Sequence, residues 1–127
     1  MGKDVDYWVN LSKYDIKTAD AMFKSRRYLY VLFTCQQAVE KILKALVTKS
    51  TKQFPPKTHD LLKLAELSKI DIDEPKKEFL SKLSFYYIET RYPQEIDRIS
   101  KDINRKMTLE YLKNTKVLLR WLKLKLK

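Results

Sequence analysis

The chain has 127 residues, of which 44% are hydrophobic and 34% charged, a composition typical of one folded domain over residues 1–127. Gly occurs once and Pro four times, too few for a glycine-rich phosphate-binding loop or a dinucleotide-binding turn. One Cys and one His exclude a disulfide framework and, within a single chain, a zinc site built from several cysteines or paired histidines. We therefore expect no metal ion and no cofactor.

Targeting and membrane segments are not evident. No apolar run approaches the roughly 20 residues of a membrane-spanning helix. The first residues, MGKDVDYW, lack the apolar core of a signal peptide. The expectation is a cytoplasmic protein with no membrane contact.

The chain is strongly basic, with 27 Lys and Arg against 16 Asp and Glu and a net charge of +11 at pH 7. Such a field attracts nucleic acid, nucleotides or acidic partners. The basic residues are scattered along the chain, however, and Lys- and Glu-rich surfaces are also typical of heat-adapted proteins. Charge alone leaves both interpretations open.

Apolar residues at helical spacing predict a first helix from the N-cap Asp4 to just before Ser25 and a second from Tyr28 to about Thr48. The second helix is apolar over most of its circumference, so it lies centrally or meets a partner on its far side. A last helix, from about Thr108, has a broad apolar face beside a basic ridge. Apolar faces of this extent mark an interface, so we expect a two-fold dimer.

Two further helices are predicted between these. Thr58 can cap the third, which extends to about residue 70, and Asp73 opens the fourth, which Pro93 ends. Residues 94–106 are polar and weakly patterned, either a loop or a short, poorly anchored helix. The sequence thus predicts an all-α, up-and-down bundle of four to five helices.

Gln36 and Glu40 lie one turn apart beside the main apolar face of the second helix. An isolated buried charge is costly, so this carboxylate must be paired or reach solvent. A structural pair with Lys41, Lys44 or a distant arginine is the simpler explanation, and a role in binding is the alternative. Cys35, on an apolar strip, is expected to be a small buried hydrophobe.

Tyr87, Arg91 and Tyr92 belong to the segment YYIETRYP at the end of the fourth helix. A guanidinium suits phosphate or carboxylate, and tyrosines can stack on a base or ribose. Arginine also interacts favourably with a helix C-terminus, which competes with a binding role. His59 is expected to start a helix and bond locally, but its imidazole titrates near neutral pH and keeps it a candidate.

Three stretches stand in a characteristic order and spacing: Trp8 to Ala19 followed by Tyr28 and Phe33; CQQAVEKILKALV (35–47) followed by PPKTHDL (55–61); and TRYP (90–93). Together, over roughly residues 5–127, they resemble the HEPN domain family (higher eukaryotes and prokaryotes nucleotide-binding). The resemblance implies a bundle of four or five helices, usually a homodimer with a cleft at its seam. It also implies a minimal nucleotidyltransferase encoded next door, many such pairs acting as toxin and antitoxin.

Active members of that family are metal-independent ribonucleases, with an arginine followed after four to six residues by a histidine. If Arg91 is the matching arginine, this sequence has Ile96, Asp97 and Arg98 where the histidine belongs. The general acid/base that RNA cleavage normally uses is therefore absent. His59 belongs to the different THDL motif.

These observations favour a non-catalytic, dimeric binding and interaction module that partners a minimal nucleotidyltransferase and binds nucleotide or RNA. The binding candidates are Arg91, Tyr87, Tyr92, Gln36, Glu40 and His59. The alternative is a metal-independent ribonuclease that uses Arg91 and Tyr92, with Glu89 or Glu95 as base. A plain helical protein whose charge only aids solubility is the third interpretation.

Overall fold

The computed structural model describes residues 2–89 and 93–127. All regular structure in this part of the chain is helical, which confirms the all-α expectation. No helix in these residues is long and apolar enough to cross a membrane. Six helices are described: α1 (Lys3–Lys24), α2 (Tyr28–Thr51), α3 (Leu61–Ser68), α4 (Glu74–Glu89), α5 (Pro93–Ser100) and α6 (Arg105–Leu124).

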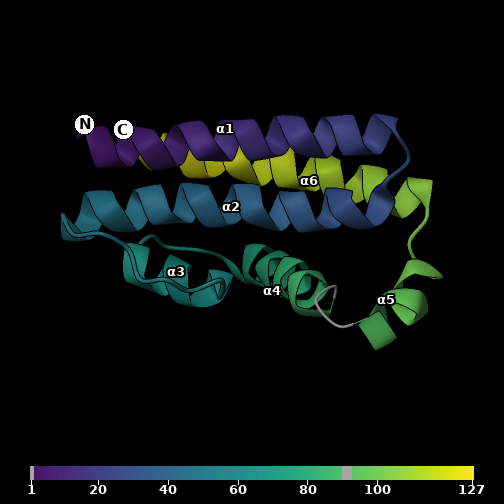
Figure 1. Ribbon diagram of the computed structural model, residues 1–127. Helices are drawn as coiled ribbons and strands as arrows, with labels where there is room; N and C mark the ends of the chain where they lie inside the picture. The colour runs from purple at the N-terminus through teal and green to yellow at the C-terminus, as the bar shows by residue number, and fades with distance from the viewer. Residues whose placement is uncertain (1, 90–92) are drawn as a thin grey trace.

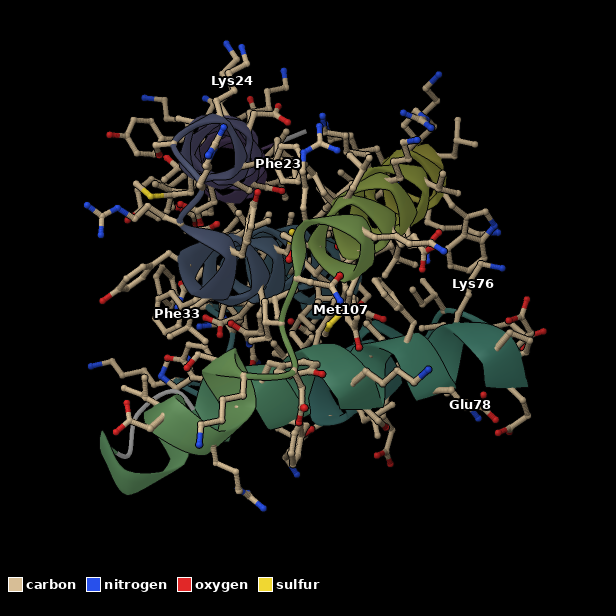
Figure 2. The ribbon with its side chains drawn as sticks, turned by 90° about the vertical axis from the view of Figure 1, so that its right-hand side faces the viewer. Phe23, Lys24, Phe33, Lys76, Glu78 and Met107 are labelled. Atoms are coloured by element: carbon tan, nitrogen blue, oxygen red, sulfur yellow. The ribbon has the colours of Figure 1, made fainter. Side chains whose placement is uncertain are left out.

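Three long helices, α1, α2 and α6, run alongside one another, and α3 and α4 cover the opposite side of α2 (Figure 1). Seen from the end of these long helices, α4 runs across them, with its first turns below α6 (Figure 2). The described part of the chain has one helix more than the four or five expected. The additional helix is α5, which lies in the segment that the sequence indicated as either a loop or a short helix. It lies at one end of the bundle, between α4 and α6 in the chain (Figure 1).

The centre of the fold is α2, which is buried over most of its circumference. Its apolar side chains contact α1 and α6 on one side and α3 and α4 on the other. Of the two alternatives that the sequence left open for this helix, a central position or a partner on its far side, the structure shows the central position. The fully buried apolar residues of α2 are Val31, Leu32, Cys35, Ala38, Val39, Ile42, Leu43 and Ala45.

Buried Cys35 is the small hydrophobe that the sequence predicted, with 0% of its surface exposed. Desolvation raises the pKa of its thiol to about 12. The thiol therefore stays protonated at neutral pH and contributes packing, not reactivity.

The ends of several helices differ from the prediction. Gly2, not Asp4, precedes α1, and Asp4 lies in the first turn, where its carboxylate faces the positive end of the helix dipole. At the other end of the chain, α6 begins at Arg105 and not at Thr108. The cause is Asn104, whose Oδ1 accepts a hydrogen bond of 2.8 Å from the backbone N–H of Met107.

The first turns of α3 and α4 are fixed by aspartate caps. Asp60, not Thr58, is the N-cap of α3, and its Oδ1 accepts from the N–H of Lys63 at 3.2 Å. Asp73 stands before α4 as predicted and accepts from the N–H of Lys76 and from its Nζ. These hydrogen bonds lower the pKa of the Asp73 carboxyl.

Candidate functional site

Four of the six binding candidates meet at one place. Gln36 and Glu40 lie on α2, His59 just before α3, and Tyr87 near the C-terminal end of α4. The other two, Arg91 and Tyr92, lie outside the described residues. The fold therefore joins candidates from three separate segments into one cluster, which we call the His59 cluster.

The carboxylate of Glu40 organises this cluster. Only 2% of its side chain is exposed. Its Oε2 accepts a hydrogen bond of 3.1 Å from Nζ of Lys44, and its Oε1 lies 2.8 Å from Nδ1 of His59. Because a carboxylate only accepts hydrogen bonds, the ring nitrogen that faces it carries the proton. Glu40 thereby fixes the orientation of the imidazole and leaves Nε2 as the other polar atom of the ring.

Gln36 joins α2 to the segment before α3. Its Nε2 donates to Oε1 of Glu40 at 3.3 Å and to the backbone carbonyl of His59 at 3.1 Å. The four-residue spacing of Gln36, Glu40 and Lys44 places the three side chains on one face of the helix. The backbone and the ring of His59 are therefore both held by α2.

The sequence-based expectation that His59 bonds locally is wrong. The local capping contacts are made by its neighbours: Asp60 caps α3, and Oγ1 of Thr58 accepts from the N–H of Asp60. Because these neighbours already make the capping contacts, the imidazole of His59 contacts Glu40, which lies 19 residues earlier in the chain. The structural pair of Glu40 with Lys44 that the sequence offered is confirmed, but Glu40 also contacts His59. Lys41, another partner considered for Glu40, pairs with Asp15 at 3.1 Å.

Aromatic rings pack around the cluster. The ring of Tyr87 lies 4.9 Å, centroid to centroid, from that of His59 and stacks at 4.9 Å on Phe33. On the other side, Nζ of Lys44 lies 5.3 Å from the ring of Trp8. These contacts hold His59 between a carboxylate and a phenol ring.

The residues of the cluster differ in their exposure to solvent, and therefore in whether they can contact a ligand directly. The side chain of His59 is 46% exposed, whereas Gln36, Glu40 and Tyr87 are buried. Gln36, Glu40 and Tyr87 therefore support the imidazole and do not form an open contact surface themselves. Among the residues the structure describes, no group of three or more His, Cys, Asp or Glu could hold a metal ion.

Two residues that contact the His59 cluster, Lys44 and Phe33, were not candidate site residues in the sequence. A signal for Lys44 exists, because a lysine four residues after a glutamate is a favourable helical pair. Phe33 carries no such signal, since its contact with Tyr87 depends on how α4 crosses α2.

Comparisons with known proteins agree with this architecture. The family model of the HEPN domain matches residues 5–125. Among solved structures, the crystal structure of TT1696 from Thermus thermophilus is similar, with a TM-score of 0.80 and 24% identity. The match covers 96% of this chain and 98% of that chain, and at this identity it shows the fold alone. Among curated proteins, none matches. The HEPN-like helical bundle expected from the sequence is thus confirmed.

Replacement of Glu40 by Ala should destabilise the protein by about 3 kcal/mol, because it leaves Lys44 buried without its carboxylate. The matched variant Asp15→Ala removes the partner of Lys41 in a more exposed pair and should cost about 1 kcal/mol or less. Urea unfolding followed by circular dichroism measures both. Equal losses in the two variants would contradict the central position of Glu40.

Proposed function

Because the chain belongs to the HEPN domain family, we propose that it is a non-catalytic binding and interaction module that takes nucleotide or RNA at the His59 cluster. We further propose that it acts in the cytoplasm as a homodimer with a minimal nucleotidyltransferase as partner, in the manner of a toxin–antitoxin pair. The family resemblance supports both the dimer and the partnership. The geometry of the His59 cluster supports the binding site.

One observation carries the binding proposal: the half-exposed imidazole of His59 is held by Glu40 and lies beside the ring of Tyr87. An oriented imidazole offers a polar edge for a hydrogen bond and a face for stacking on a base. A side chain held in advance loses little conformational entropy when it binds a ligand. The buried partners of His59 thus act in binding by holding the imidazole, which is the part of the cluster exposed to solvent.

The start of α2 supports RNA over a single nucleotide. Exposed Arg26 and Arg27 and the half-exposed Tyr30 surround a cleft of about 280 Å³ there. Phe33, which stacks on Tyr87, lies one turn further along the same helix. A strand whose backbone contacts these arginines can therefore bring a base toward His59.

Binding of a single-stranded RNA of about 12 nucleotides, followed by fluorescence anisotropy, tests the site. His59→Ala should weaken binding about tenfold, because it removes a stacking and hydrogen-bonding group. Arg27→Ala should reduce the slope of log K against log salt by about one, because it removes one phosphate contact. The controls are Tyr14→Ala and Lys17→Ala, exposed residues of α1. RNA affinity that is the same in His59→Ala and Tyr14→Ala contradicts the proposed site.

The dimer is proposed to form over the C-terminal turns of α4. Phe85 is 49% exposed there, a large apolar side chain of the kind that a two-fold interface covers. Light scattering at micromolar concentration should give twice the chain mass, and Phe85→Lys should give the monomer. A monomer mass independent of concentration for the unmodified protein is the contrary result.

RNA cleavage is the second candidate function, and a specific observation favours it. A carboxylate that holds Nδ1 of His59 leaves Nε2 of the neutral ring as a proton acceptor, which is the arrangement of a general base. This base differs from the Glu89 or Glu95 considered from the sequence, whose side chains lie outside the described part. Arg91 would then contact the phosphate.

Incubation of the purified protein with mixed RNA separates the two functions. The binding proposal predicts intact RNA in the presence of a chelator, for the unmodified chain and for His59→Gln alike. Cleavage that is lost in both His59→Gln and Arg91→Ala would overturn the non-catalytic assignment in favour of the ribonuclease. Cleavage that persists in both variants indicates a contaminating nuclease and leaves the binding proposal standing.

A further inference from the structure

A groove lies between the first turns of α4 and the second half of α6, away from the His59 cluster. Its cavity has a volume of about 530 Å³. Figure 2 shows Lys76 in this space, between α4 and α6. Its apolar lining is formed by Phe79 of α4 and by Val117, Leu118 and Trp121 of α6.

The α6 side of the groove continues into an exposed apolar stripe. Val117 is 56% exposed and Leu124 is 59% exposed, with the partly exposed Trp121 between them. These three residues are spaced i, i+4 and i+7, so they lie on one face over two turns. A stripe with this spacing matches the apolar face of a second helix laid along it.

The α6 side of the groove is basic, whereas the α4 side carries both signs of charge. Residues 111–127 contain six basic residues and no acidic one. Nζ of Lys76 and Nζ of Lys125 lie 4.5 and 4.7 Å from the ring of Trp121. Lys82 also lines the groove. Of the acidic groups in the groove lining, Asp73 is already paired with Lys76 at 2.7 Å and Glu78 is exposed.

We propose that this groove binds an amphipathic helix of a partner protein, with apolar side chains on one face and acidic side chains along the two edges. The apolar face would cover Val117, Trp121 and Leu124, and the acidic edges would meet the basic residues of the second half of α6. This inference depends on the proposed function in one respect only, namely that the chain acts together with a partner protein.

Charge and shape favour this occupant over others. A second copy placed symmetrically on the stripe would bring the basic half of one α6 against the same half of the other, and like charges repel. A lipid surface is flat, whereas the groove is a concave cavity. The groove also stands apart from the nucleic-acid site, because Lys76 and Tyr87 are separated by about 16 Å along α4.

The fluorescence of Trp121 tests the proposal directly. Trp8→Phe leaves Trp121 as the sole tryptophan of the chain. The probe is a synthetic peptide of about five helical turns, with leucines on one face and glutamates on its edges. Its matched controls are a peptide with the same residues redistributed around the helix and a peptide with lysine in place of glutamate.

The glutamate peptide should shift Trp121 emission to shorter wavelength and saturate at micromolar concentration, while the two control peptides leave the spectrum unchanged. Val117→Lys and Leu124→Lys should each weaken binding tenfold or more, and Leu62→Lys, at a similarly exposed leucine of α3, should not. Equal binding of the redistributed peptide overturns the proposal. So does a Trp121 shift produced by single-stranded RNA, or by raising the protein concentration without peptide.

RNA binding by the Val117→Lys variant distinguishes a failure of the groove proposal from a failure of the proposed RNA site. RNA anisotropy measured on Val117→Lys should match that of the unmodified protein, because the stripe does not contact the His59 cluster. Loss of RNA binding in Val117→Lys together with peptide binding would show that one basic surface serves both, and would contradict the assignment of separate surfaces.

Discussion

The structure depends on one buried carboxylate, that of Glu40 in the middle of α2. A carboxylate removed from water is costly unless its oxygens accept hydrogen bonds. Here Lys44, His59 and Gln36 all approach it. These contacts place a group from before α3 against the central helix, beside the C-terminal turns of α4. The same interaction therefore organises the packing of the bundle and orients the one imidazole of the chain.

Helical spacing predicted most of this architecture, because apolar periodicity in α1 and α6 is strong and α2 is apolar over most of its circumference. It also identified Gln36 and Glu40, since polar residues beside a continuous apolar face are conspicuous. What spacing could not provide is the position of His59, which depends on the path of the chain between α2 and α3. The same limit explains the central burial of α2: periodicity shows an apolar surface, but tertiary packing decides whether α3 and α4 or a second copy covers it.

The crossing of α4 gives the molecule two different surfaces. Its last turns meet His59, Phe33 and the start of α2, where arginines and aromatic rings are suited to a nucleic-acid strand. Its first turns stand below α6 and enclose an apolar groove beside the basic second half of that helix. In the proposed scheme one helix separates RNA recognition from partner recognition, so a partner could occupy the protein without blocking the imidazole.

The tautomer of His59 tests the central claim most directly, and the chain has a single histidine, so its nitrogen signals are unambiguous. A long-range proton–nitrogen NMR spectrum, recorded at a pH where the ring is neutral, distinguishes the two forms. The account predicts that Nδ1 carries the proton, because it faces the Glu40 carboxylate, and that this preference is lost in Glu40→Leu. A ring protonated mainly at Nε2, or a spectrum unchanged by Glu40→Leu, would contradict it.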